Sequence, residues 1–163
     1  MRDSFHDDLD GIGTSLVEMG HLVNKAMERA TTALLTADLK VAEEIISEDD
    51  TIDDMQHDIE ARAINLMARQ QPVAGDLRTL VTSLRMSADL ERMGDLAHHV
   101  AKLTRMRYPA AAVPPELVLT LQEMGNVTAR ITQKAIGVIE SRNLEAALQL
   151  EKDDDEMDIL HRR

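Results

Sequence analysis

Acidic residues four positions apart are the part of this sequence best suited to chemistry. Three such pairs stand out: Asp49 with Asp53, Glu91 with Asp95, and Asp154 with Asp158. On a helix, residues four apart share a face, so both carboxylates of a pair can reach one cation. Oxygen ligands suit Mg, Mn, Ca or Fe(II), and a nearby histidine extends the range to Zn. We therefore expect divalent or trivalent metal ions here (Fe, Zn, Mn or Mg), although such pairs also occur on ordinary solvated faces.

Two of these pairs continue lines of apolar residues along predicted helices. The first line contains Ala42, Ile46, Asp49, Asp53, Glu60, Ile64 and Met67, and the second contains Leu80, Leu84, Ser87, Glu91, Asp95 and His98. Surface acids ordinarily lie opposite the apolar face, whereas these are aligned with it. Carboxylates crowded there repel one another, which raises their pKa values. A bound cation would remove that repulsion.

Histidines offer a second possible ligand pattern. Five of the six histidines follow an acid by three positions: Asp3/His6, Glu18/His21, Asp54/His57, Asp95/His98 and Asp158/His161. Glu-x-x-His on bundle helices is the arrangement of di-iron carboxylate proteins, so a ferritin-like di-iron protein is the alternative interpretation. The interpretation without metal binding is a set of solvent-exposed acid–histidine pairs one helical turn apart.

The chain contains an internal repeat at an offset of 105 residues, the separation of Asp49 from Asp154. Glu18-Met19-Gly20 returns as Glu123-Met124-Gly125 at the same offset. A fixed-period repeat indicates one helical unit used twice. The acids repeat and the histidines do not, which favours the acids as the principal ligands.

Composition narrows the classes of protein and partner. The 163 residues carry a net charge of −12, which argues against nucleic acid and anionic lipid as electrostatic partners. The chain has no cysteine and no apolar run long enough to span a membrane, and its N-terminus does not resemble a signal peptide. We expect a cytoplasmic protein. We also expect that the protein is not an enzyme. Its serines lack a G-x-S-x-G context, and no glycine-rich phosphate loop follows a strand.

Helical spacing of aliphatic and methionine residues predicts an all-α fold. Aromatics make up 1% of the sequence, and the four prolines and seven glycines leave room for few turns. The only proline-rich connection predicts three segments, residues 1–108, 109–115 and 116–163. The expected helices cover about Phe5–Thr36, Asp38–Arg69, Pro72–Arg107, Glu116–Glu140, and a last stretch from Asn143.

Two strings in the third predicted helix and just before it resemble the PhoU family. They are Gln71 to Arg78, Q-P-V-A-G-D-L-R, and Asp89 to Asp95, D-L-E-R-M-G-D. The resemblance implies tandem three-helix bundles with metal ions held by the acidic motifs. It also implies a non-enzymatic negative regulator of phosphate uptake and of the phosphate-starvation response. Such regulators act between a phosphate ABC transporter ATPase and a sensor histidine kinase.

The chain departs from the family pattern in its second repeat. The equivalents of Glu91 and Asp95 would lie beyond Arg163, so Asp154 and Asp158 have no partner helix within this sequence. We therefore expect the second bundle to be incomplete. Its two helices should expose an apolar stripe, which favours a homodimer. The stripe comprises Leu117, Leu121, Met124, Leu144, Leu148 and Met157.

Overall fold

The computed structural model describes residues 2–162, and side chains for residues 4–48 and 50–162. All regular elements in this range are α-helices or a 3₁₀ helix, and none is a strand. This confirms the all-α prediction. No helix in this range is long and apolar enough to cross a membrane. The elements are α1 (Arg2–Thr36), α2 (Leu39–Ser47), α3 (Asp49–Gln70), α4 (Ala74–Arg107), the 3₁₀ turn η1 (Pro115–Leu117), α5 (Val118–Ser141) and α6 (Leu144–His161).

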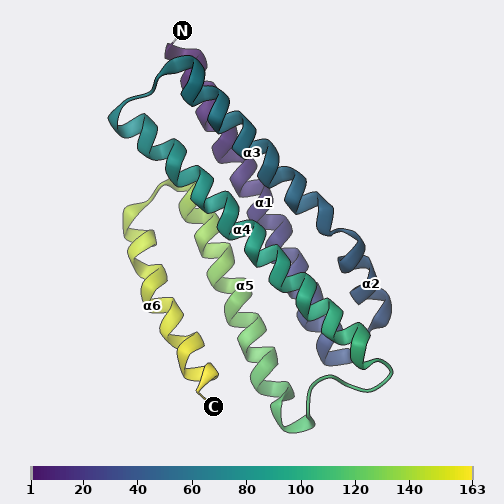
Figure 1. Ribbon diagram of the computed structural model, residues 1–163. Coiled ribbons are helices and arrows are strands. Elements are labelled where there is room, and N and C mark those ends of the chain that lie inside the picture. Colours follow the sequence, from purple (N-terminus) through teal and green to yellow (C-terminus); the bar gives the residue numbers. More distant parts are fainter. Residues whose placement is uncertain (1, 163) are drawn as a thin grey trace.

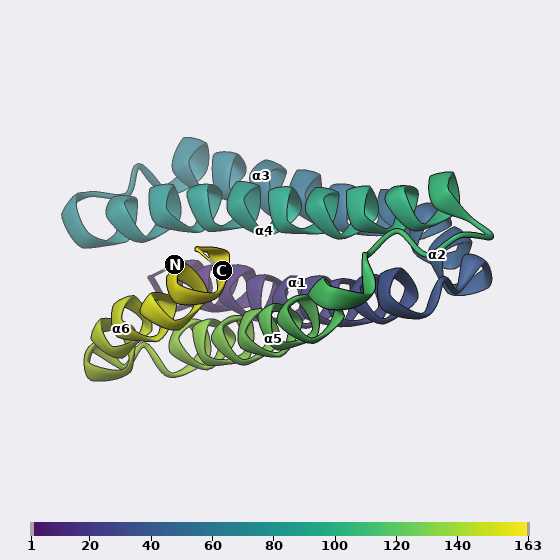
Figure 2. The ribbon, with the colours of Figure 1, turned by 90° about the horizontal axis from the view of Figure 1, so that it is seen from below.

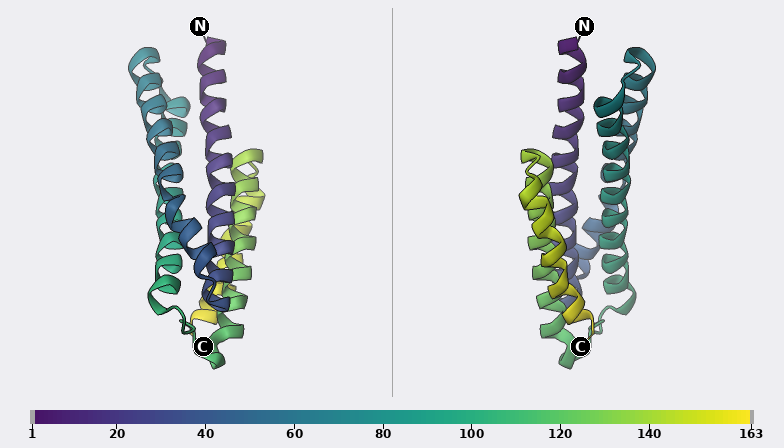
Figure 3. Two further views of the ribbon diagram at one scale, coloured as in Figure 1. Left: turned by 90° about the vertical axis from the view of Figure 1, so that its right-hand side faces the viewer. Right: turned by 90° about the vertical axis from the view of Figure 1, so that its left-hand side faces the viewer.

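The helix α1 lies at the centre of the arrangement. It packs against α4, α3 and α2 on one side and against α5 on another, while α6 packs only on α5 within the described residues. Figure 1 shows the long helices running roughly side by side, and Figure 2 shows α3 and α4 in one layer with α1 and α5 in a second. Figure 3 shows α1 between the α3–α4 pair and the α5–α6 pair.

Two apolar clusters fill the layer between α1 and α4. The larger joins α1, α3 and α4, and its fully buried side chains include Ile12, Met19, Ile59 and Leu80. The smaller is built mainly of alanines from α1, α2 and α4, with Ile45 among them. Small side chains let these helix ends approach closely. Aliphatic residues thus form the core that the scarcity of aromatics predicts.

The junctions that follow α1 and α5 have the same chemistry, 105 residues apart. Asp38 accepts a hydrogen bond from the Val41 amide at 3.1 Å, and Asn143 accepts one from the Ala146 amide at 3.0 Å. The residues just before these caps, Ala37 and Arg142, are both left-handed, with φ of 52° and 53°. Each side chain satisfies an amide that has no partner inside its helix. The repeat therefore extends to the detail of how one helix ends and the next begins.

The first and second copies of the repeat meet along α1 and α5. A Cβ on Gly20 would lie 2.8 Å from Cγ1 of Ile136, and a Cβ on Gly125 would lie 2.6 Å from Cγ2 of Thr31. Gly20 and Gly125 are equivalent positions of the repeat, and so are Thr31 and Ile136. Each glycine therefore receives the other helix at the equivalent residue. This reciprocity is the contact pattern of a local twofold axis between antiparallel helices.

The largest difference from the predicted helix boundaries is a break in the second expected helix. The helix expected from Asp38 to Arg69 is interrupted at Glu48, which ends α2 and precedes α3. Glu48 has φ of −91° and ψ of −1°, and its carboxylate accepts a hydrogen bond from Arg29 of α1 at 2.6 Å. Neither glycine nor proline marks this interruption. The third helix also begins slightly later than expected, since Pro72 lies ahead of α4.

Candidate functional site

Three of the predicted ligands lie where α3 passes α4. Asp53 on α3 and both Glu91 and Asp95 on α4 are half-buried. Gly94 explains the close approach of the two helices, because a Cβ there would lie 2.9 Å from Cδ1 of Ile52. Ile52 precedes Asp53, and Gly94 precedes Asp95. The apolar contact therefore places the acidic turns of two helices beside each other.

The arrangement supplies carboxylate oxygens from two helices, which is the donor type that hard divalent cations prefer. Among the described side chains, however, no three His, Asp or Glu groups are gathered closely enough to hold a metal ion. The side chain of Asp49, the fourth predicted ligand of this repeat, lies outside the described residues. A metal ion at Asp49, Asp53, Glu91 and Asp95 therefore stays a prediction.

The second acid pair has different surroundings. Asp154 and Asp158 are both exposed on α6. Asp158 accepts a hydrogen bond from Arg162, one helical turn away, at 3.1 Å. Since α6 contacts only α5 in the described chain, these carboxylates face no helix equivalent to α4. The structure thus places the two copies of the acidic motif in unlike environments.

The expected acidic lines are half right. Along α4 the line is confirmed: Leu80 and Ser87 are buried, and Glu91, Asp95 and His98 are half-buried. Along α3 the line is wrong, since Glu60 is exposed and Ile64 is 52% exposed. The buried residues of α3 are instead Ile52, Ile59, Ala63 and Leu66. These residues continue the buried stripe of Ile45 across the interruption, so the acidic line lies beside the buried face of α3 and not on it.

The histidines do not form the core that a di-iron protein needs. His21, His57 and His161 are exposed on α1, α3 and α6. Among the five histidines that follow an acid by three positions, only His98 is half-buried. It lies on α4 one turn after Asp95. An auxiliary role for a histidine in metal binding stays a prediction.

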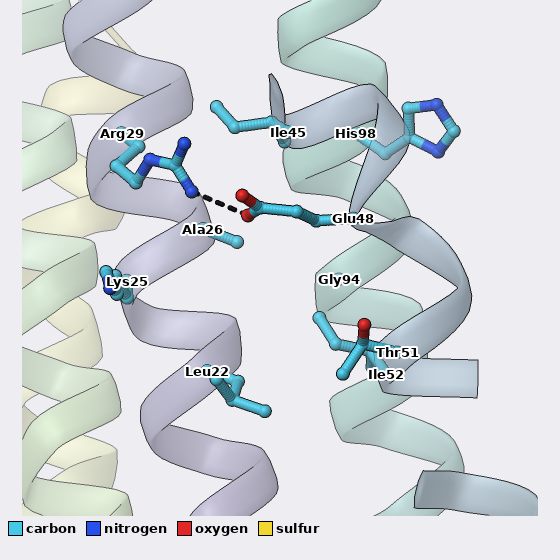
Figure 4. A pocket seen from close by; sticks show the side chains of 10 residues that line it. All are labelled: Leu22, Lys25, Ala26, Arg29, Ile45, Glu48, Thr51, Ile52, Gly94 and His98. Atoms are coloured by element: carbon cyan, nitrogen blue, oxygen red, sulfur yellow. Dashed lines mark hydrogen bonds and ion pairs between the residues drawn. The ribbon is translucent and has the colours of Figure 1, made fainter. Parts of the chain in front are cut away.

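A hollow of about 280 Å³ adjoins the interruption between α2 and α3. Lys25 and Arg29 of α1, Glu48, Thr51 and His98 line it together with apolar residues. Figure 4 shows Arg29 reaching from α1 to Glu48. Its second terminal nitrogen donates to Glu44 at 2.8 Å. The hydrogen bond to Glu48 is the main cause that raises the pKa of Arg29 above its ordinary value.

Arg29 was not predicted as a functional residue, because its type and spacing in the sequence resemble those of any surface arginine. Its role becomes visible only in space, where it fixes the residue that directly precedes the acidic stretch of α3. A basic residue on α1 thus contacts both Glu44 of α2 and Glu48 at the start of the acidic stretch.

Comparison with known proteins decides the family. The PhoU domain matches residues 16–104, more than half of the chain. The chain belongs to the PhoU family. It is 45% identical over 162 residues to the phosphate-specific transport system accessory protein PhoU homolog 2 of Mycobacterium tuberculosis, covering 99% of this chain and 76% of that protein.

Solved PhoU structures share the fold. The crystal structure of PhoU from Pseudomonas aeruginosa matches with a TM-score of 0.89 and 28% identity, over 97% of this chain and 75% of that one. The PhoU structure from Streptococcus pneumoniae matches with a TM-score of 0.85 and 26% identity, over 96% and 72% of the two chains. The family resemblance of the two strings in and just before α4 is therefore confirmed.

The second PhoU repeat contains the counterpart of the Arg29 contact. Lys134 of α5 donates to Asp153 of α6 at 2.6 Å. Lys134 and Asp153 are the equivalents of Arg29 and Glu48 at the repeat offset. The hydrogen bond from Lys134 is the main cause that lowers the pKa of Asp153. Both repeats thus use a base on the first helix to hold the acid that precedes the Asp-Asp motif.

A further ion pair exists only in the second repeat. Arg130 binds Glu156, and the equivalent positions in the first repeat are Lys25 and Thr51. Lys25 and Thr51 both line the hollow at the α2–α3 interruption. The first repeat therefore has an open space where the second has a closed ion pair. The offset pairs Arg29/Lys134 and Glu48/Asp153 are the sequence signal that could have revealed these contacts.

Proposed function

We propose that this PhoU-family protein is a non-enzymatic negative regulator of phosphate uptake in the cytoplasm. It acts as an adaptor between a phosphate ABC transporter ATPase and a sensor histidine kinase. The observation that carries this proposal is 45% identity, over 99% of this chain, to a protein named as an accessory protein of phosphate-specific transport. The match to PhoU crystal structures along nearly the whole chain supports the same assignment.

A reporter assay tests the regulatory role directly. The protein is expressed in a bacterial strain that lacks its own PhoU protein and carries a phosphate-starvation reporter. In phosphate-rich medium we expect the reporter to be repressed. A reporter that remains fully active, with the protein present at normal levels, would contradict the proposal.

A capture experiment tests the adaptor role separately. The tagged protein is incubated with the purified transporter ATPase and, in a second tube, with the cytoplasmic part of the sensor kinase. We expect retention of both partners. Retention of neither, by a protein that represses the reporter, would reject the adaptor role while leaving the regulatory role intact.

We also propose that Asp49, Asp53, Glu91 and Asp95 bind a divalent or trivalent metal ion in the first repeat. The support is the half-burial of Asp53, Glu91 and Asp95 and the glycine-mediated approach of α3 to α4. Half-buried like charges destabilise a fold unless a cation compensates them. Binding should therefore raise the melting temperature, since a ligand of the folded state stabilises it by mass action.

Thermal melts in chelator and in added Mn, Zn, Fe or Mg measure this effect. We expect at least one of these ions to raise the melting temperature of the protein. Identical melts under all of these conditions would reject the metal proposal. The protein is further proposed to self-associate, since apolar side chains of η1 and α6 such as Leu117 and Leu144 are exposed.

A further inference from the structure

A line of arginines runs along the outer side of α4. Arg78, Arg85 and Arg92 are seven residues apart and exposed, and the exposed His99 continues the series. The buried residues of α4 also recur at steps of three and four, on the opposite side of the helix. At the rise of an α-helix the three arginines span about 21 Å. Both sides of α4 therefore keep a regular repeat along the same stretch.

The three arginines have no partner within the described part of the chain. No hydrogen bond or ion pair joins them to another described residue, although Asp89 lies four positions after Arg85. Elsewhere in the protein Arg29, Arg62 and Arg142 each hold a carboxylate. The helix packs only on α1, α2 and α3, and Figure 2 shows the far side of the α3–α4 layer free of other helices.

Exposed apolar side chains accompany the arginines. Val81, Leu96, Leu103 and Met106 are 37%, 48%, 44% and 78% exposed, whereas no lysine or glutamate of α4 is exposed. Protein interfaces are enriched in arginine and methionine and depleted of lysine and glutamate, and arginine is frequent among the residues that dominate binding. We call this surface the arginine face. It comprises Arg78, Val81, Arg85, Arg92, Leu96, Leu103 and Met106.

Two arginines of this face belong to the strings that resemble the PhoU family. Arg78 ends Q-P-V-A-G-D-L-R, and Arg92 lies within D-L-E-R-M-G-D. In the second string the core uses Leu90 and Gly94, and the proposed metal site uses the outer acids. Neither the core nor the proposed metal site gives Arg92 a role. Arg78 also borders the groove between α4 and the start of α6, so Arg85 and Arg92 form the centre of the free surface.

The basic surface is only one helix wide. The neighbouring helix α3 exposes Asp50, Asp54, Asp58 and Glu60, and the net charge of the protein is −12. A broad anionic surface, such as a membrane or a nucleic acid, would meet these acids as well and be repelled by them. A single acidic helix would meet the arginine face alone. The narrowness of the basic surface thus favours a helix as its partner.

We infer that the arginine face binds an acidic helix of a partner protein. This helix carries carboxylates at steps of seven residues, with apolar residues beside them. Two helices that cross at about 20° keep such a repeat in contact along their length. Each guanidinium matches a carboxylate with two parallel hydrogen bonds, and opposite charges beside an apolar contact fix the register of the pair. The inference rests on the adaptor role proposed above and gives that role a contact surface.

Charge reversal in the capture experiment tests this contact. Arg85→Glu/Arg92→Glu changes two exposed residues, so the melting temperature should stay the same. Retention of the transporter ATPase or of the sensor kinase should fall about tenfold or more. The matched control, Arg105→Glu/Arg107→Glu, reverses the same number of charges at the end of α4, away from the line of arginines. It should leave retention unchanged.

A designed peptide tests the same surface without either protein partner. The probe is a helix with glutamate at every seventh position beside a line of leucines, and its control carries glutamine instead. By fluorescence anisotropy, the natural chain should bind the glutamate peptide about tenfold or more tightly than the glutamine peptide. A third peptide, with lysine in place of glutamate, should bind Arg85→Glu/Arg92→Glu and not the natural chain. Leu96→Gln/Leu103→Gln should weaken binding of the glutamate peptide.

Partner retention or peptide binding that the charge reversal leaves unchanged would overturn the inference. Binding of the natural chain to vesicles of anionic phospholipid through Arg85 and Arg92 would also overturn it, because the face would then belong to a membrane. So would a dimer, measured by light scattering, that only Arg85→Glu/Arg92→Glu dissociates, because the occupant would then be a second copy. A natural chain that binds the glutamate peptide and retains neither partner would reject the adaptor role and support the preference of this face for an acidic helix.

Discussion

The two repeats place the same helical pattern in a core and at a surface. Leu16, Met19 and Val23 of α1 are fully or almost fully buried beneath α4 and its neighbours. Their equivalents on α5, Leu121, Met124 and Thr128, are only half-buried. The difference shows that α4 completes the core of the first repeat. An amphipathic stripe specifies which face is to be covered, but a third helix must cover it.

The contacts between the first and second helices are, by contrast, kept in both repeats. The pair Arg29 and Glu48 corresponds to Lys134 and Asp153, and the caps Asp38 and Asn143 also correspond. Yet the helix is interrupted at Glu48 and continuous through Asp153. The contact of the base with the acid is therefore the same in both repeats, while the helical geometry of the acidic stretch differs.

Shortening a side chain at the interface of the two repeats should have the largest effect on the free energy of unfolding. Ile136 is 2% exposed and fills the space above Gly20. Ile136→Ala should lower the free energy of unfolding by about 2–5 kcal/mol, because it removes buried surface and leaves a cavity. Urea unfolding followed by circular dichroism measures the change. A loss well under 1 kcal/mol would mean that the repeats do not depend on this contact.

Adding one methyl group to Gly20 should have a smaller effect. In Gly20→Ala the new Cβ meets Ile136 at 2.8 Å, so overpacking costs about 1–3 kcal/mol against a helix-propensity gain of about 1 kcal/mol. Gly137→Ala is the matched control, since nothing lies within 4 Å of its Cβ, and it should stabilise the protein. In an Ile136→Ala background the cost of Gly20→Ala should disappear. Additive effects would show that the two residues do not meet.

Replacing the basic residues that contact the acidic stretches should have the next largest effect on the free energy of unfolding. Arg29→Met should lower stability by about 1 kcal/mol, because two carboxylates lose their partner while the apolar stem is kept. Lys134→Met should cost less, since it frees only one carboxylate and Arg130 remains near Asp153. Chemical unfolding of both variants gives the order. Equal losses would mean that the second carboxylate of the Arg29 contact contributes nothing.

The smallest effect should appear at low pH. Lys134 holds the pKa of Asp153 below its ordinary value of 3.8. A carboxyl with a lowered pKa in the folded state stabilises the fold above its unfolded pKa, and that stability is lost as pH falls through the folded pKa. Asp153→Asn should therefore destabilise the protein near neutral pH and make no difference in strong acid. Parallel urea titrations at about pH 6 and below about pH 3 test this. A difference that persists in acid would contradict the role of this ionised carboxylate.

The fold could be predicted largely from the periodicity of the sequence. Aliphatic spacing gave the long helices, and the caps Asp38 and Asn143 marked two helix starts correctly. The interruption at Glu48 was missed because apolar spacing continues across it from Ile45 to Ile52. The contact with Arg29 does not mark it either, since the equivalent contact of Lys134 with Asp153 leaves α6 continuous.

The candidate site was predicted only in part, because sequence spacing describes one helix and not the contact between two. Spacing along α4 correctly indicated that Glu91 and Asp95 would lie at the edge of the core. It could not indicate that Gly94 of α4 lets Ile52 of α3 approach closely, because this depends on how the two helices cross. The expected exposure of the second repeat is confirmed for Leu117, Leu144 and Leu148, while Leu121, Met124 and Met157 are half-buried. Packing on α5 and α6 covers one side of these three residues.

Metal analysis of matched variants tests most directly the claim that the first repeat alone carries a complete acidic site. The natural chain and the Glu91→Ala, Asp95→Ala and Asp158→Ala variants are purified identically, and their metal content is measured by elemental analysis. We predict that the natural chain and Asp158→Ala retain the ion, whereas Glu91→Ala and Asp95→Ala lose it. Absence of metal from the natural chain after loading, or equal loss in all three variants, would contradict the claim.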